Sequence, residues 1–207
     1  GKVELSQIRN LVVEDLLRRA PVKLQSQCID DFFAGKRVMI TGAGGSIGSE
    51  LCRQVAASHP ASLILYERYE NSLYAIQNEL VRRGHQERLC ALIGDITDEQ
   101  RLQAVMRTHR PQIILHAAAH KHVPLMEASP CEAVKNNVGG TRAIAEAAHH
   151  HHVERFVMIS TDKAVNPSSV MGATKRVCEI MTSIAAAQTG KVYCSVRFGN
   201  VLGSSGS

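Results

Sequence analysis

Short apolar segments alternate with longer amphipathic ones along most of the chain, from Lys36 onward. The apolar segments are rich in β-branched and aliphatic residues, which predicts strands buried on both faces: residues 37–41, 62–66, 89–93, 112–116, 156–160 and 192–197. Helices are predicted between them, over residues 49–57, 72–83, 99–108, 131–149 and 170–189. This alternation implies right-handed βαβ crossovers. We therefore predict an α/β protein with a Rossmann-like, doubly wound parallel sheet that has helices on both faces.

The first 35 residues precede this alternation. Segment 5–19 has apolar residues at the spacing of an amphipathic helix: Ile8, Leu11, Val12, Leu16 and Leu17. Pro21 ends this helix, and residues 29–33 form a second short helical patch. We predict a helical arm over residues 1–35, packed on an NAD(P)-binding Rossmann domain over residues 36–207.

Composition is that of an ordinary globular protein, with 44% hydrophobic and 21% charged residues. The net charge is +5, and the Lys and Arg residues are scattered along the chain. They are not interleaved with aromatic residues, and Trp is absent, which argues against a nucleic-acid groove. The same charge suits anionic ligands such as phosphates. Six cysteines lie far apart without a CxxC pair, as expected of thiols in a reducing compartment. The run of His at 149–152 has no acidic or Cys partner nearby, so no metal is expected.

No apolar run approaches the roughly 18 residues that a membrane helix needs. We expect this segment to be cytoplasmic and to make no membrane contact, either as a soluble protein or as the cytoplasmic domain of an inner-membrane protein.

A glycine-rich turn follows the first predicted strand, with the sequence Thr41-Gly-Ala-Gly-Gly-Ser-Ile-Gly48. Glycine permits a positive φ and leaves room for a phosphate, and the N–H groups of the following helix can hold a pyrophosphate. A strand–turn–helix context is what this mechanism requires. We therefore predict that the cofactor-binding residues here are Gly42, Gly45, Ser46, Ile47 and Gly48.

The second strand is followed by two charged residues that bear on the choice of cofactor. Glu67 lies 19 residues after Gly48, about where an acid accepts hydrogen bonds from the adenosine ribose and favours NAD. Arg68 comes next and could face the 2′-phosphate of NADP instead. We expect NAD, with NADP as the alternative.

The spacing TGxxGxxG resembles that of the extended short-chain dehydrogenase/reductase superfamily. Through this resemblance, Asp95 and Ile96 after the third strand are expected at the adenine edge, and Asn137 is expected to support the active site. The small residues Ala117, Ala118 and Ala119 after the fourth strand would let the backbone approach the cofactor.

The segment from Ser160 to Lys175 follows the fifth strand, at the edge where open α/β sheets bind ligands. In the superfamily, a Ser or Thr here and a Tyr-x-x-x-Lys on the next helix form the hydride-transfer site, which implies Thr161 and Lys175. Met171 occupies the Tyr position. A thioether cannot exchange a proton, so the base for the substrate hydroxyl is not identified.

Three segments together, at 116–127, 160–175 and 196–203, resemble the CapD-like polysaccharide-biosynthesis proteins, which are nucleotide-sugar 4,6-dehydratases acting on UDP-N-acetylglucosamine. The resemblance implies that His120, Lys121 and Asn200 bind the UDP-sugar. It also implies an internal redox cycle: oxidation at C4, loss of water across C5–C6, and return of the hydride to C6.

The elimination needs a base and an acid, for which Lys163 and Asp162 are the candidates. Lys163 would need a lowered pKa and Asp162 a raised one. The family continues into a smaller C-terminal substrate domain beyond this chain, so the 207 residues alone are expected to be inactive. A homo-oligomer is expected. The alternatives are a C4 epimerase or reductase, and a catalytically silent NAD-binding module.

Overall fold

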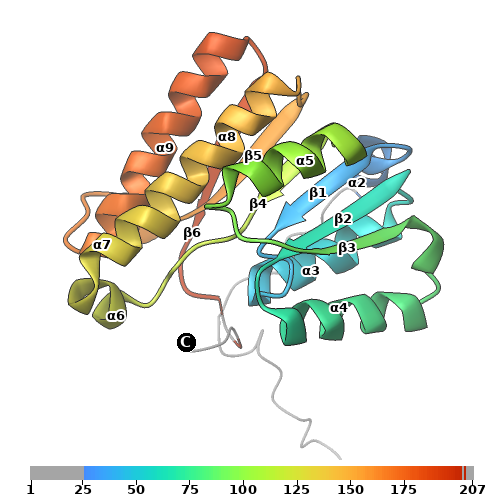
Figure 1. Ribbon diagram of the computed structural model, residues 1–207, viewed down its shortest axis with the longest axis horizontal. Coiled ribbons are helices and arrows are strands. Elements are labelled where there is room, and N and C mark those ends of the chain that lie inside the picture. The colour runs from blue at the N-terminus through green and yellow to red at the C-terminus, as the bar shows by residue number, and fades with distance from the viewer. Residues whose placement is uncertain (1–25, 202, 204–207) are drawn as a thin grey trace, which may run out of the picture.

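The computed structural model describes residues 26–201 and 203. Its sheet has six parallel strands in the order β3-β2-β1-β4-β5-β6 (Figure 1). Each predicted strand matches an observed strand to within one residue at either end. The strands are β1 (Arg37–Thr41), β2 (Ser62–Glu67), β3 (Leu89–Ile93), β4 (Ile113–His116), β5 (Arg155–Thr161) and β6 (Val192–Phe198). The predicted doubly wound Rossmann-like sheet is confirmed.

The helices agree with the prediction except around the fourth crossover. The predicted helices correspond to α3 (Ser46–Ala57), α4 (Glu70–Arg82), α5 (Glu99–His109) and α9 (Val170–Thr189), and the patch at 29–33 lies in α2 (Ser26–Phe33). The predicted helix over 131–149 is instead three pieces: α7 (Pro130–Ala133), the π-helical η3 (Val134–Gly139) and α8 (Gly140–His150). The helix α6 (Val123–Ala128) and the short 3₁₀ turns η2 (Gln86–Arg88) and η4 (Asp162–Ala164) were not predicted. The helix predicted over 5–19 lies outside the described residues.

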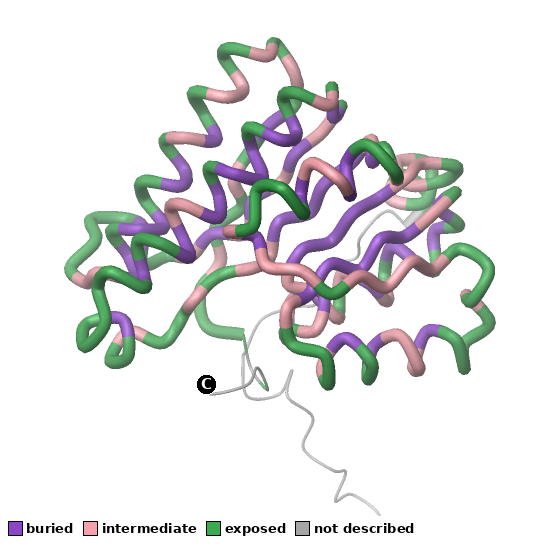
Figure 2. Tube along the Cα trace, in the orientation of Figure 1, coloured by how far each residue is buried: buried purple, intermediate pink, exposed green. Residues whose placement is uncertain are grey.

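Helices cover the sheet from both sides (Figure 1). Along β1, Val38 and Ile40 pack in a core with residues of α3 and α4, whereas Met39 packs in a second core with residues of α5, α8 and α9. Because successive side chains of a strand point to opposite faces, this division gives two apolar layers. The buried residues, purple in Figure 2, accordingly lie mostly along the central strands.

The outer strands depart from the prediction of burial on both faces. In β5 only alternate residues are buried, and in β6 Val192 and Val196 are 61% and 44% exposed. The reason is position: β6 is the edge of the sheet, and among the described residues α9 packs on it from one face. The burial of alternate residues in β5, and of Tyr193 alone in β6, therefore reflects the end of the sheet.

Parallel register brings the carboxyl ends of the strands to one edge. Thr41 is paired with both Tyr66 and His116, and Thr161 with Phe198. The segments that follow the strands therefore emerge together, as the binding edge of an open α/β sheet requires.

A buried histidine ties this edge together. The Nδ1 atom of His116 lies 2.7 Å from Thr41 Oγ1, and its Nε2 atom lies 3.1 Å from Thr141 Oγ1 in α8. Burial, reinforced by the charge of Lys175, lowers the pKa of His116 to about 3. The neutral ring thus links the end of β1, the end of β4 and the start of α8.

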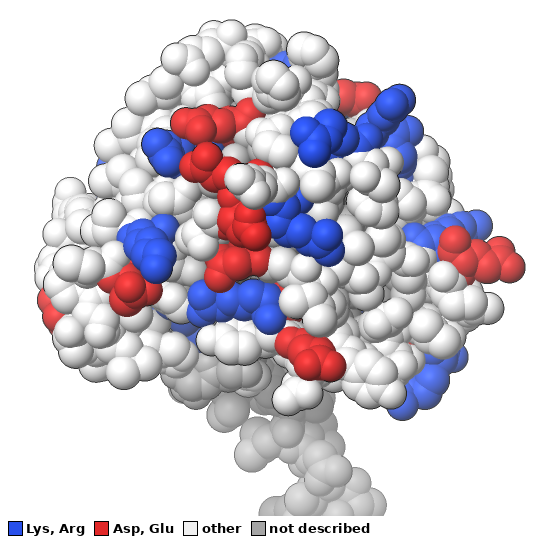
Figure 3. All heavy atoms as spheres, in the orientation of Figure 1, with Lys and Arg blue, Asp and Glu red and all other residues white. Residues whose placement is uncertain are grey.

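Charge is mixed on the surface. Acidic and basic side chains are interspersed on the face shown in Figure 3, where α5 and α8 lie toward the viewer. An ion pair between Arg142 and Glu99 joins these two helices, with the atoms 3.1 Å apart. Within the described part of the chain, no helix combines the length and apolar character needed to cross a bilayer.

Candidate active site

The glycine turn connects β1 to α3. Gly42 has φ +68°, and a Cβ on it would lie 2.7 Å from the backbone nitrogen of Ala118. A Cβ on Gly48 would overlap the carbonyl oxygen of Gly42. These two glycines are therefore required by the packing of the turn on itself and on the Ala117–Ala118 backbone, before any ligand is considered.

Gly45 differs from the other two glycines. It is the N-cap of α3, with φ −72°, and the nearest atom to a Cβ there is Gly42 O at 3.3 Å. No side chain caps the helix at this point. Since the first N–H groups of a helix lack intrahelical partners and carry its positive dipole end, this terminus fits an anionic group. The predicted residues Ser46, Ile47 and Gly48 form its first turn.

Glu67 lies at the end of β2, against the turn. Its side chain is buried and accepts hydrogen bonds from the backbone N–H groups of Gly44 at 3.0 Å and of Arg68 and Tyr69 at 2.9 and 3.0 Å. The carboxylate is thereby fixed beside the glycine turn. Sequence spacing alone placed Glu67 near the ribose, but the contact with Gly44 is visible only in the structure.

Arg68 follows β2 at the carboxyl edge of the sheet, and its side chain contacts residues from two other segments. Its Nη1 atom is 3.5 Å from Asp95 Oδ2 and donates to Asn136 Oδ1 at 3.3 Å. Asp95 also accepts hydrogen bonds from the N–H and hydroxyl of Thr97, both at 2.8 Å. Partial burial acts to raise the pKa of Asp95, but the Thr97 hydrogen bonds and the Arg68 charge outweigh it, so this pKa lies below its usual value.

Ile96 follows Asp95 but turns into the core. It is 5% exposed, and a Cβ on Gly140 of α8 would meet its side chain. The side chain of Ile96 therefore packs the sheet against α8. Ala117 and Ala118 are half-buried beside Gly42, whereas Ala119 is exposed.

Asn137 lies in the π-helical turn. Its amide accepts a hydrogen bond from His120 N at 2.8 Å and donates to His120 O and to Thr174 Oγ1, both at 3.0 Å. The carbonyl oxygen of Asn137 also accepts a hydrogen bond from the thiol of Cys178 in α9, at 3.2 Å. π-Helical turns often occur at functional sites. This turn joins the loop after β4 to the helix that carries Lys175.

Asn136 and Thr174 are site residues that the sequence analysis missed. Each directly precedes a predicted residue, Asn137 or Lys175, and this adjacency is the only signal for them in the sequence. Lys121, which was predicted to bind substrate, is exposed.

Lys175 and Met171 face different surroundings. Lys175 is 6% exposed, makes no side-chain hydrogen bond or ion pair within residues 26–201, and has a pKa lowered by burial, which Cys178 and Glu179 partly oppose. Because the side chain is mostly buried, a polar ligand such as a ribose at its ammonium group would offset the cost of that burial. Met171 instead packs with Met126 and Ala133 in a small apolar cluster under α6 and α7.

The residues after β5 and β6 form one polar group. Lys163 Nζ donates to Asp162 Oδ1 at 3.2 Å and to Asn200 Oδ1 at 3.1 Å. Thr161 Oγ1 donates to Asp162 Oδ1 at 3.0 Å. These hydrogen bonds, first from Thr161 and then from Lys163, lower the pKa of Asp162. The raised pKa expected for a general acid is therefore wrong for this exposed conformation, because these hydrogen bonds outweigh the slight desolvation of the carboxylate.

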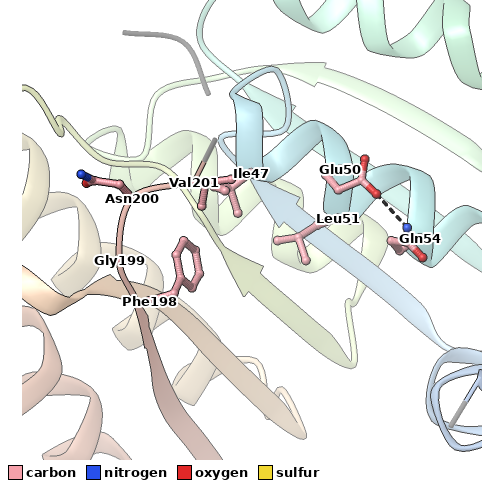
Figure 4. A pocket seen from close by; sticks show the side chains of 8 residues that line it. All are labelled: Ile47, Glu50, Leu51, Gln54, Phe198, Gly199, Asn200 and Val201. Carbon is pink, nitrogen blue, oxygen red and sulfur yellow. Dashed lines mark hydrogen bonds between the residues drawn. The ribbon is translucent and has the colours of Figure 1, made fainter. Parts of the chain in front are cut away.

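A hollow of about 280 Å³ lies between α3 and the segment after β6 (Figure 4). Ile47, Leu51 and Phe198 contribute its apolar lining, and Asn200 and Val201 border it. The structure thus brings the predicted cofactor residue Ile47 and the predicted substrate residue Asn200 to the same hollow.

A parallel sheet in this strand order, with a glycine turn at its first crossover and polar groups gathered at its carboxyl edge, defines a Rossmann-like domain of the short-chain dehydrogenase/reductase type. More narrowly, the chain belongs to the polysaccharide biosynthesis protein family, whose model matches residues 38–207.

Relatives with assigned names support this membership. The chain is 48% identical to the capsular polysaccharide biosynthesis protein CapD of Staphylococcus aureus over all of its own length and 35% of that protein. It is 34% identical to a UDP-N-acetylglucosamine 4,6-dehydratase (inverting) of Campylobacter jejuni and 33% identical to a UDP-glucose 4-epimerase of Rickettsia rickettsii, over 84% of the chain and 52% of each relative. The chain thus spans about a third to a half of the length of these relatives.

Among solved structures, DesIV of Streptomyces venezuelae, a dTDP-glucose 4,6-dehydratase with NAD and TYD bound, matches with a TM-score of 0.69 at 26% identity. The match covers 78% of this chain and 55% of DesIV. NAD is thus bound by a structural neighbour of this fold.

Proposed function

We propose that the protein is an NAD-dependent nucleotide-sugar 4,6-dehydratase that acts on UDP-N-acetylglucosamine for surface polysaccharide synthesis. The observation that carries this proposal is the joined group of Thr161, Asp162, Lys163 and Asn200 at the carboxyl edge of the sheet. An acid and a base side by side are what an elimination of water requires.

The residues around the glycine turn fit a dinucleotide. The uncapped start of α3 would hold the pyrophosphate, Glu67 the adenosine ribose, and Lys175 the ribose next to the reacting ring. When bound, NAD would supply the group that accepts the hydride from C4 and later returns it to C6. The protein's own contribution is to hold the sugar and to move protons at C5 and at the C6 hydroxyl.

Lys163 and Asp162 are assigned to the two proton movements. Neutral Lys163 Nζ would take the C5 proton, and protonated Asp162 would give a proton to the leaving C6 hydroxyl. Their side chains are 41% and 57% exposed, so a sugar bound over them would desolvate both. Desolvation disfavours the charged form of each group, lowering the pKa of the lysine and raising that of the aspartate. Burial by substrate thus shifts both groups toward the required states.

NAD rather than NADP is favoured by the arrangement of charges. The Glu67 carboxylate is fixed beside the turn, where it would repel a 2′-phosphate. Arg68, which could have attracted that phosphate, is directed to Asp95 and Asn136. We also expect a homo-oligomer.

A C4 epimerase on the same scaffold is the second candidate, and the Rickettsia relative is the observation that favours it. Epimerisation uses the same cofactor site but needs no acid–base pair for loss of water. The products separate the two reactions, because only dehydration yields a 4-keto-6-deoxy sugar.

The test is made on the full-length protein with UDP-N-acetylglucosamine, by following the product by NMR. Lys163→Ala and Asp162→Asn should each slow dehydration by about 10²–10⁴-fold, the usual contribution of a positioned acid or base. Lys36→Ala is the matched control, since its ion pair with Glu154 lies at the opposite edge of the sheet, before β1. Near-normal rates in both site variants would show that the pair is structural and the reaction wrongly assigned.

A further inference from the structure

Glu179 is a buried carboxylate that the proposed reaction does not use. It lies in α9, one helical turn after Lys175, and is 4% exposed. A buried charge is costly unless it is paired and hydrogen-bonded. Its partners therefore indicate what it is for.

Those partners come from three different elements. Ser160 of β5 donates its hydroxyl to Oε1 of Glu179 at 2.6 Å. Arg197 of β6 donates from Nε to Oε1 at 2.7 Å and from Nη2 to Oε2. Arg176 of α9 donates to Oε2 at 3.0 Å. Hydrogen bonding from Arg197, first of all, lowers the pKa of Glu179 to about 2, so the group is a carboxylate at any working pH.

The pairing of the strands makes this contact specific. Ser160 and Arg197 are partners in the parallel register of β5 and β6, so Glu179 holds both members of one pair. The next pair, Thr161 with Phe198, is the last of the two strands. Directly beyond it lie Lys163 and Asn200, whose side chains meet at 3.1 Å.

We propose that Glu179 is a positioning residue, which locks β5, β6 and α9 together so that Lys163, Asn200 and Lys175 keep a common geometry. A single carboxylate then joins the three elements that carry the reacting group, without touching substrate itself. The catalytic consequence rests on the proposed function, whereas the positioning itself does not.

Glu179→Gln removes the charge while keeping the shape of the side chain. Glu79→Gln is the matched control: Glu79 also accepts two hydrogen bonds from one arginine, Arg53, at 2.8 and 3.0 Å, but between α3 and α4. Ser160→Ala is a milder second variant, which removes one hydrogen bond and leaves the ion pair in place.

The first measurement is amide hydrogen exchange of the full-length protein, without substrate. In Glu179→Gln, residues 160–163 and 198–200 should exchange at least about tenfold faster, because local opening is no longer opposed by the shared carboxylate. Ser160→Ala should show a smaller change in the same residues, and Glu79→Gln none there. Unchanged exchange in Glu179→Gln, or in Ser160→Ala if Glu179→Gln does not fold, overturns the proposal.

The second measurement separates positioning from stability. At a temperature well below the melting point of each variant, kcat of Glu179→Gln should fall by about 10²-fold, as expected for a displacement near 1 Å. NAD affinity should fall by less than kcat does, because the glycine turn and Glu67 lie on β1, α3 and β2, and of the proposed NAD contacts only that of Lys175 depends on Glu179. Normal kcat in a variant with faster exchange would refute the catalytic part. If the wild type forms no keto sugar, the proposed function fails, and the exchange experiment still decides whether Glu179 positions the strands.

Discussion

Two glycines of the same turn should respond in opposite ways to an added methyl group. In Gly48→Ala the new Cβ would overlap Gly42 O and lie 2.7 Å from Gly42 C and 3.0 Å from Ala43 Cα, all of them backbone atoms. In Gly45→Ala the nearest atom is Gly42 O at 3.3 Å, and φ −72° suits any residue. The first substitution should damage the fold and the second should damage ligand binding.

The size of each effect depends on whether backbone atoms must move to make room for the new methyl group. Relieving the Gly48→Ala overlap requires a backbone shift, which costs about 3 kcal/mol, at the upper end of overpacking effects. In a domain of this size that corresponds to about 6–12 °C in Tm. Gly45→Ala should cost under about 1 kcal/mol, the usual difference between N-cap residues. If a phosphate sits over α3, however, the methyl should weaken NAD binding by at least about tenfold, equivalent to 1.4 kcal/mol.

The assay is thermal unfolding of each variant, with and without NAD, together with calorimetric titration. Gly139→Ala is the control, because the nearest atom to its Cβ is 4.0 Å away. Normal Tm in Gly48→Ala would refute the packing argument. Undiminished NAD affinity in Gly45→Ala would show that the start of α3 does not hold the pyrophosphate.

Three further predictions concern the cofactor, the buried histidine and the chain itself. NAD should bind more tightly than NADP, with the difference reduced in Glu67→Gln; equal affinities by calorimetry would make Arg68 the deciding residue. The pKa of His116 is about 3 in the folded protein and about 6.5 in the unfolded chain. The stability that depends on its neutral ring is therefore fully present above pH 6.5 and is lost as the pH falls toward 3. Between pH 7 and 5 the wild type should therefore lose about 2 kcal/mol more than His116→Gln in urea unfolding, and parallel losses would contradict this. Finally, the 207-residue chain should gain Tm with NAD but not with UDP-sugar, and formation of a 4-keto sugar by it would refute that expectation.

Some of the site could be predicted only as a list of residues. The sequence indicates Asn137, His120 and Lys175 separately, each by resemblance. Contacts between them depend on η3, whose wider turn arises where this helix packs on α9. Helical periodicity over 131–149 did not reveal this turn, because a single π-helical turn shifts the side-chain pattern by only about one residue.

Met171 and Asp162 show the same limit for chemistry. Sequence position assigns both to the reacting centre, yet Met171 packs with Met126 and Ala133, and Asp162 has a lowered pKa. Burial and hydrogen-bond partners decide these properties, and both depend on elements distant along the chain. For Glu179, sequence position suggests no role, and the structure assigns one. This acid of α9 accepts hydrogen bonds from Ser160 and Arg197 because the pairing of β5 and β6 brings both residues beside it.

The sequence by itself determined the strands, most helices and the glycine turn, because these depend on local periodicity and on the φ angles open to glycine. Tertiary structure decided which faces of β5 and β6 are exposed, where Arg68 is directed, and how Lys163 reaches Asn200. The physical reason is that hydrogen bonds and burial at the carboxyl edge join residues far apart in the chain, and no local pattern encodes those distances.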